Sequence, residues 1–183
     1  MPAKRSKRPG KDDEKAKPLI SLQRCYNQEC IKSSIDPLDS FRRSIKNCLE
    51  AEKGVVPLEK LAIEPPKPPK VPKRKKETEE NDVVEVIDKP PPLQGLEVTK
   101  CLTPVCFALK TQNFVQIQEL SFFGFPLSLH SSTVFADTMK AMQYPLLKLE
   151  FEDCELCQES INRLSQCLPF LPKLKSISFD YNS

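Results

Sequence analysis

The residue types that carry most enzymatic chemistry are scarce in this sequence of 183 residues. It contains a single histidine, His130, which gives no basis for a histidine-based triad or a histidine-rich metal site. Its four glycines stand apart, so neither G-x-x-x-x-G-K nor G-x-G-x-x-G, the spacings that hold phosphate groups, can occur. We therefore expect no catalytic residues, no cofactor and a protein that is not an enzyme.

Cysteine is better represented, with eight residues, six of which form the close pairs Cys25/Cys30, Cys101/Cys106 and Cys154/Cys157. The last pair has the spacing C-x-x-C, which occurs in zinc sites and in redox pairs. The N-terminal residues lack the apolar run of a secretory signal, so we expect a reducing compartment and free thiols. Because no second C-x-x-C follows, structural thiols are the favoured interpretation. A zinc site built from the last two pairs together is the alternative.

One apolar spacing occurs three times in the last third of the chain. The pattern is L-x-x-L-x-L-x-x-N/C, and its second copy follows the first by 29 residues and precedes the third by 28. In each copy the second and third apolar residues stand two positions apart, as on one face of a β-strand. The copies are Ile117/Leu120/Phe122/Phe125, Leu146/Leu149/Phe151/Cys154 and Leu174/Ile177/Phe179/Asn182.

The segments between these strand patterns have a different period. Their apolar residues recur at three- and four-residue spacings, which predicts helices. The residues are Phe135, Met139 and Met142 in the first gap, and Ile161, Leu164, Leu168 and Leu171 in the second. Each unit is therefore one strand and one helix, which can bury its apolar side only against a neighbouring unit.

This consensus, with a period in the high twenties, resembles the leucine-rich repeats, in particular their ribonuclease-inhibitor-like subclass. The resemblance implies an α/β fold: a solenoid fragment with parallel strands, preceded by a helical N-terminal cap region and a disordered linker. It also implies a structural role for Cys154, which stands where family members place Asn or Cys. Ser183 follows the third strand pattern without a further helix or cap, so we expect a C-terminally truncated array.

We divide the chain into four parts: a basic disordered tail at 1–17, a helical cap region at 18–63, a proline-rich charged linker at 64–95 and the repeats at 96–183. In the cap region, apolar spacing predicts one helix over Leu19–Cys30 and another from Asp36-Pro37 to about Lys53, with Gly54 as its stop. Alternation of Val105, Phe107 and Leu109 predicts a leading cap strand over 104–109, beside the strand at Ile117.

The cap region ends in Leu58–Ile63, an imperfect copy of the strand pattern. A short helical pair containing Tyr26, Cys30 and Pro37, followed by such a strand, resembles the start of leucine-rich-repeat proteins of cilia and centrosomes. The resemblance implies a cytoplasmic protein with a structural role at the cilium or centrosome.

Charge is distributed unequally along the chain. Residues 1–76 hold 20 Lys and Arg against 10 Asp and Glu, whereas residues 77–183 hold 8 against 15. Lys73, Arg74, Lys75 and Lys76 form either a nuclear-import signal or a solvated basic run. No aromatic residue lies among them, so neither base stacking nor a nucleic-acid partner is expected. Val83–Ile87, in an acidic stretch, resembles a SUMO-interacting segment, and docking on this protein's own sheet is the alternative.

The outward strand positions give the best candidate site. They carry four carboxylates and two aromatic rings, at Phe123, Glu150, Glu152, Asp153, Asp180 and Tyr181. The favoured function is a non-catalytic scaffold or adaptor whose inner sheet face binds a basic protein segment. For any single carboxylate, solubility of an exposed sheet is the simpler explanation. The alternative function is a nuclear module that uses the import signal and the SUMO-interacting-like segment. No apolar run approaches the roughly 18 residues of a membrane span.

The import hypothesis predicts that a fluorescent fusion of the full chain accumulates in the nucleus, and that replacing Lys73, Arg74, Lys75 and Lys76 by Ala abolishes this accumulation. The same distribution for both fusions, measured by microscopy, would assign the run to solvated charge.

Overall fold

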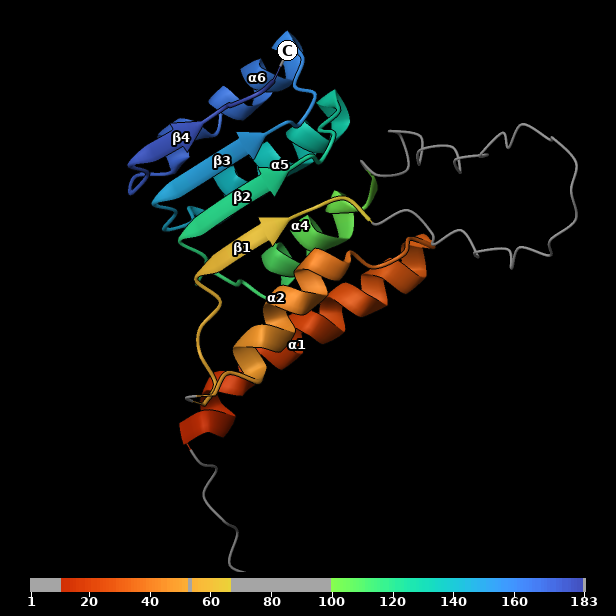
Figure 1. Ribbon diagram of the computed structural model, residues 1–183, viewed down its shortest axis with the longest axis vertical. Helices are drawn as coiled ribbons and strands as arrows, with labels where there is room; N and C mark the ends of the chain where they lie inside the picture. The colour runs from red at the N-terminus through yellow and green to blue at the C-terminus, as the bar shows by residue number, and fades with distance from the viewer. Residues whose placement is uncertain (1–10, 53, 67–99, 183) are drawn as a thin grey trace, which may run out of the picture.

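The computed structural model describes residues 11–52, 54–66 and 100–182 (Figure 1). The elements occur in this order: α1 (Lys11–Ser33), α2 (Asp39–Leu49), β1 (Lys60–Ile63), α4 (Leu102–Thr111), β2 (Glu119–Phe123), α5 (Leu129–Met142), β3 (Lys148–Glu152), α6 (Gln158–Ser165), the 3-10 helix η1 (Leu168–Phe170) and β4 (Ser176–Ser178).

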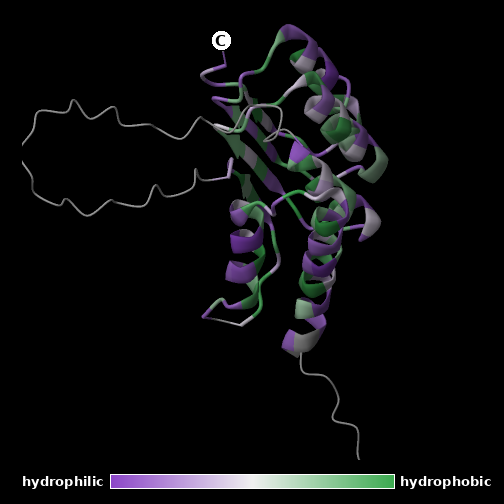
Figure 2. Cartoon of the chain, turned by 90° about the vertical axis from the view of Figure 1, so that its right-hand side faces the viewer, coloured by the Kyte–Doolittle hydropathy of each residue, from purple (hydrophilic) through white to green (hydrophobic). Residues whose placement is uncertain are grey.

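The four strands of the described residues form one sheet in the order β1-β2-β3-β4, and every neighbouring pair is parallel. A parallel connection needs a crossover, and α4, α5 and α6 supply the crossovers here. These three helices lie behind the sheet in Figure 1, and Figure 2 shows them on one side of it from a second direction. The predicted α/β fold with parallel strands is confirmed.

The strand register places the repeated apolar residues side by side. Leu120 is the register partner of Leu149, and Leu149 is the partner of Ile177. Leu61 precedes them in the same row, opposite Leu120. The expectation that these positions lie in neighbouring parallel strands is therefore confirmed, and the strand predicted at Leu58–Ile63 is the first member of the sheet.

A stack of phenylalanine rings runs through the core two positions further along the strands. The ring centroids of Phe122 and Phe151 lie 5.2 Å apart at an interplanar angle of 9°, and those of Phe151 and Phe179 lie 5.4 Å apart at 11°. Phe135 of α5 meets the ring of Phe122 edge-on, at 5.3 Å and 88°. Each such pair contributes about 0.5–1.5 kcal/mol beyond the area that it buries. The apolar residues of the strand patterns and of the helix patterns therefore pack in one hydrophobic core.

The residues that close each strand also repeat in their hydrogen bonds. Asn182 Nδ2 donates to the carbonyl oxygens of Phe151 and Asp180 at 2.8 and 3.0 Å. One unit earlier, Cys154 Sγ donates to the carbonyl oxygens of Phe122 and Glu152 at 3.5 and 3.3 Å. Both side chains therefore join the end of their own strand to the end of the preceding strand.

The predicted cap strand at 104–109 is wrong, because this segment lies in helix α4. Leu102, Val105, Cys106 and Leu109 are buried at three- and four-residue spacings, whereas Phe107 is 43% exposed. Pro104 falls in the first turn, where its missing N–H breaks no helical hydrogen bond. Helix α4 follows β1 as α5 follows β2, so the segment completes a strand and helix unit.

Both predicted helices of the cap region exist, with different limits. Helix α1 begins at Lys11, so residues 11–17, predicted to belong to a disordered tail, are helical. Helix α2 begins at Asp39 and ends at Leu49, instead of running from Asp36-Pro37 to about Lys53. Its start is fixed from α1, because the backbone N–H of Leu38 donates to the buried Tyr26 hydroxyl at 2.6 Å. The Tyr26 ring packs against Phe41 with centroids 4.5 Å apart.

Replacing Phe151 by Ala should lower the free energy of unfolding by about 3–5 kcal/mol, since the ring is fully buried and stacked on both faces. Phe123, on the same sheet and 37% exposed, is the matched control, and its replacement by Ala should change the free energy by about 0.5 kcal/mol. Urea denaturation of both variants measures the difference. Equal losses would contradict the packing described here.

Candidate interaction surface

The face of the sheet opposite α4, α5 and α6 presents the side chains that alternate with the buried ones. Three rows cross the strands at this face. The row nearest the strand starts contains Lys60, Glu119, Lys148 and Ser176, and the next contains Ala62, Ser121, Glu150 and Ser178. The third begins with the register partners Phe123 and Glu152, and Asp180 follows two residues after Ser178. The side chains that alternate with buried residues along each strand therefore form short rows across this face of the sheet.

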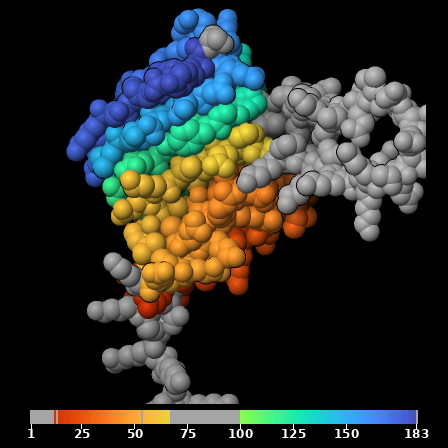
Figure 3. All heavy atoms as spheres, in the orientation of Figure 1, coloured from red at the N-terminus to blue at the C-terminus, as the bar shows by residue number. Residues whose placement is uncertain are grey.

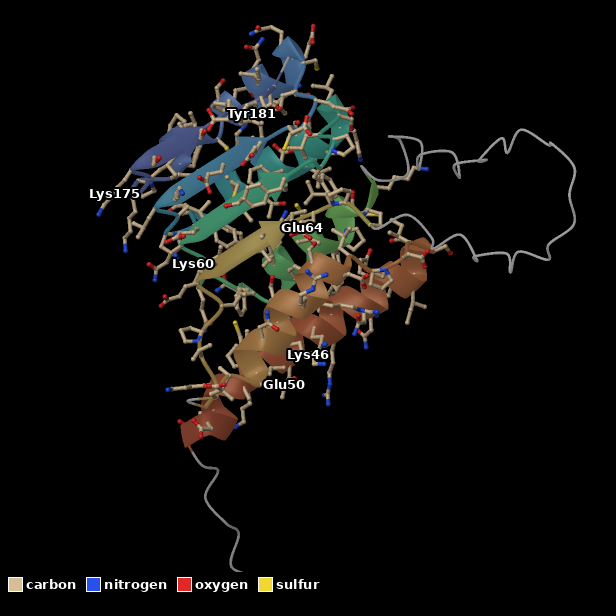
Figure 4. The ribbon with its side chains drawn as sticks, viewed as in Figure 1. Lys46, Glu50, Lys60, Glu64, Lys175 and Tyr181 are labelled. Carbon is tan, nitrogen blue, oxygen red and sulfur yellow. The ribbon has the colours of Figure 1, made fainter. Side chains whose placement is uncertain are left out.

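In the first two rows, lysine side chains form ion pairs with the carboxylates of the same rows. Lys60 Nζ lies 2.8 Å from Glu119 Oε2 on the adjacent strand, and Lys148 Nζ lies 2.7 Å from Glu150 Oε1. The other carboxylate oxygen of Glu150 accepts a hydrogen bond of 2.8 Å from Ser121 Oγ. Figure 4 labels Lys60 at the start of β1, where this network begins. The charged groups of these rows are therefore paired with one another on the sheet face.

These contacts shift the pKa values of the two central groups in opposite directions. The hydrogen bond from Lys148, followed by that from Ser121, holds the pKa of the Glu150 carboxyl below its ordinary value. The hydrogen bond to Glu150 raises the pKa of Lys148. Both groups are therefore charged at neutral pH, and each is the principal partner of the other.

The strand ends carry a different combination of groups. Glu152, Asp153 and Asp180 are exposed, and none of them makes an ion pair with another described residue. Ser178 Oγ donates a short hydrogen bond to Asp180 Oδ2. Two aromatic rings lie at the same edge: Phe123, 37% exposed, and Tyr181, 82% exposed and labelled in Figure 4. We call these five residues the acidic edge.

The backbone of the acidic edge repeats from unit to unit. The residue after the last outward position has a left-handed conformation in three successive units, with φ of 57° at Gly124, 53° at Asp153 and 56° at Tyr181. Only the first of these positions holds glycine, which adopts this conformation without steric cost. The shared backbone turn holds Asp153 and Tyr181 at equivalent places beside neighbouring strands.

The structure thus brings together five of the six residues predicted for the site and gives Glu150 a different environment. Glu150 belongs to the neutralised rows, where Lys148 and Ser121 bind both of its oxygens. Sequence reasoning missed the row of Lys60, Glu119 and Lys148. Each of these residues immediately precedes a buried leucine of the strand pattern, so aligning the first strand with the others would have revealed their alternating charge.

The other residues considered for chemistry are dispersed. His130 is exposed in the first turn of α5. Burial raises the pKa of the Cys154 thiol to about 11 and that of Cys106 to about 12, so both are protonated and poor nucleophiles at neutral pH. Cys157 is exposed, with its sulfur 3.3 Å from Ser160 Oγ. Within the described ranges, no three His, Cys, Asp or Glu residues are grouped as metal ligands.

Two predicted segments lie outside the described residues: the basic run at 73–76 and the SUMO-interacting-like segment Val83–Ile87. Of the predicted linker, only residues 64–66 are described.

Comparison with known proteins does not identify the family of this chain. The chain matches no family model, no curated protein and no solved structure. In the part of the chain that the structure describes, no helix has both the length and the apolar character needed to cross a membrane.

Replacing Lys148 by Ala should raise the pKa of the Glu150 carboxyl toward its ordinary value, because the principal cause of its lowering is removed. Replacing Ser121 by Ala should raise the same pKa by less. An NMR titration of the Glu150 side chain in the three proteins measures both effects. An unchanged pKa in Lys148→Ala would show that this ion pair does not form in solution.

The same shift predicts a pH dependence. Since the pKa of Glu150 is lower in the folded than in the unfolded protein, its carboxylate stabilises the fold above the unfolded pKa, and this stability is lost as the pH falls through the folded pKa. Acid should therefore reduce the free energy of unfolding more steeply in the native sequence than in Lys148→Ala.

Proposed function

We propose that this chain is a non-catalytic protein-interaction module of the leucine-rich-repeat type, and that its acidic edge binds a basic segment of a partner protein. The observation that carries the proposal is the contrast within one sheet face. The carboxylates of the first two rows are engaged by lysines, whereas Glu152, Asp153 and Asp180 at the strand ends face solvent without a described cationic partner.

The repeat assignment is supported by three regularities. The strands stack in sequence order and in register, the phenylalanine rings repeat along the stack, and Cys154 and Asn182 make equivalent bonds to the backbone of the preceding unit. Units that contact only their neighbours are typical of repeat proteins, in which the strand face commonly receives partners.

A basic, extended segment fits the acidic edge in charge and in spacing. Neighbouring strands lie about 4.8 Å apart, so the carboxylates of β3 and of the segment after β4 form a short line across the strands. A segment crossing them could place Lys or Arg ammonium and guanidinium groups against the carboxylates. The exposed rings of Phe123 and Tyr181 lie at the same edge and could receive a cation on their faces. The resulting recognition is electrostatic and should weaken with salt.

The proposed location in the cell is based on the resemblance to leucine-rich-repeat proteins of cilia and centrosomes. We propose the cytoplasm, at the cilium or the centrosome, as the site of action, and the nucleus as the alternative if the basic run at 73–76 acts as an import signal.

Binding is tested with the full chain and a fluorescent Lys/Arg-rich peptide, by anisotropy at low salt. The double variant Glu152→Lys/Asp180→Lys should weaken binding at least about tenfold, because attraction becomes repulsion. Glu150→Gln should have a smaller effect, since that carboxylate is already paired with Lys148.

The matched control is Asp137→Lys, which reverses an exposed carboxylate on α5 outside the sheet face. It should leave the affinity near that of the native sequence. If reversal at the acidic edge and reversal at Asp137 have the same effect, the peptide is responding to net charge, and the proposed surface is wrong.

A further inference from the structure

Strand β1 ends at the row of the sheet face that carries the acidic edge. Glu64 comes directly after the last paired residue of β1, so it begins the row of Phe123 and Glu152. Helix α2 fixes this position, because Ser40 Oγ accepts from the Glu64 N–H at 3.1 Å and donates to the Glu64 carbonyl oxygen at 3.3 Å. Figure 3 shows the yellow atoms of β1 against the orange atoms of α2. The chain therefore leaves β1 from a fixed point beside the acidic edge.

Along this row, a paired carboxylate is followed by unpaired ones. Glu64 Oε2 lies 4.0 Å from Arg43 Nη1 of α2. Two strands further, Glu152 and Asp153 are exposed and make no ion pair with a described residue. Phe123, 37% exposed, lies between them and Glu64, on β2. Strands β2 and β3 each have a strand on both sides, so this part of the face belongs to the interior of the sheet.

The sequence that continues from β1 carries the complementary charge within reach of this row. The basic run at 73–76 begins seven residues after Pro66, and seven residues span at most about 25 Å. Strand β3 lies two strand spacings from β1, which is about 10 Å. The description resumes at Lys100, and α4 begins on the same side of the sheet because it connects the end of β1 with the start of β2 (Figure 1). Both ends of the intervening segment are therefore attached on the side of the acidic edge.

We propose that the basic run at 73–76 binds Glu152 and Asp153 of its own chain and so competes with the basic segment of a partner. This inference rests on the proposed function, since the same face would receive both ligands. The charges are complementary, and an arginine or lysine of the run can also lie on the exposed ring of Phe123. A ligand on the same chain acts at an effective concentration on the order of mM. A partner must therefore displace the run before it can bind.

The other basic cluster of the sequence is attached far from this face. Lys4, Arg5, Lys7 and Arg8 precede α1, a helix of 23 residues and about 35 Å. The red end of α1, where this cluster is attached, lies at the opposite end of the molecule from the acidic edge in Figure 1. The two clusters carry the same number of positive charges, so the cluster at 4–8 is the matched control for the run at 73–76.

The first experiment needs no partner. Backbone amide NMR spectra of the full chain are compared at low salt for the native sequence, for a run variant with Ala at 73–76, and for a tail variant with Ala at 4, 5, 7 and 8. The amide signals of Phe123, Glu152 and Asp153 should shift in the run variant and stay unchanged in the tail variant. Molar salt should bring the native spectrum to that of the run variant, because exposed charges are then screened.

Three outcomes would overturn the proposal. One is an acidic edge whose signals are the same in the native sequence and the run variant. Another is an equal shift in both variants, because the edge would then be responding to net charge. The third is a difference that disappears on dilution, since the run would then bind a second copy instead of its own chain.

The second experiment measures competition, by anisotropy with the fluorescent Lys/Arg-rich peptide. The run variant should bind the peptide about tenfold more tightly than the native sequence, because the competing ligand is removed. The tail variant has the same net charge and should show a smaller gain. Adding Glu152→Lys to the run variant should abolish the gain. Equal gains in the run and tail variants would contradict competition at this face.

The two experiments separate this inference from the proposed function. If the peptide binds and Glu152→Lys weakens its binding while the NMR spectra of the native sequence and the run variant agree, only the inference fails. If the peptide binds none of the proteins while the NMR difference is present, the proposed function fails and the contact within the chain remains established.

Discussion

The structure depends on lateral contact between equivalent side chains of neighbouring parallel strands. No strand in the described residues exceeds five residues, and a parallel strand of that length has no stability of its own. Stability comes from stacking Leu61, Leu120, Leu149 and Ile177 in one row, and Phe122, Phe151 and Phe179 in the next. The period of 28 or 29 residues is the length needed to build a strand, return through a helix and begin the next strand in register.

Backbone hydrogen bonding at the strand ends reinforces the stack. Beyond the last ladder bond, peptide groups turn away from the sheet and need other partners. Asn182 supplies both kinds of partner, since its Oδ1 accepts from Cys154 N–H at 2.8 Å while its Nδ2 donates to Phe151 O. Cys154 supplies only a donor, and burial keeps its thiol protonated so that it can donate. The repeat position therefore accepts either residue type for the same physical reason.

The spacing of apolar residues predicted the sheet and its hydrophobic interior. It gave the wrong secondary structure where the same residues fit both a strand period and a helix period. Val105, Phe107 and Leu109 alternate as in a strand, whereas Leu102, Val105, Cys106 and Leu109 follow a helix. Because a long segment separates β1 from α4 in the sequence, the pattern did not indicate that this strand and this helix form one unit. The pairing of Lys60 with Glu119 was missed because it is visible in the sequence only when the first strand pattern is aligned with the second in the register of β1 against β2. The start of α2 was also unpredictable, since a tyrosine of another helix fixes it.

A stack of this kind has a gradient of local stability. Opening the described β4 unit exposes Leu174, Ile177 and Phe179, which are only partly buried, whereas opening the β3 unit exposes three fully buried side chains and breaks contacts on both sides. The amide hydrogens of β4, as described here, should therefore exchange with solvent faster than those of β2 or β3.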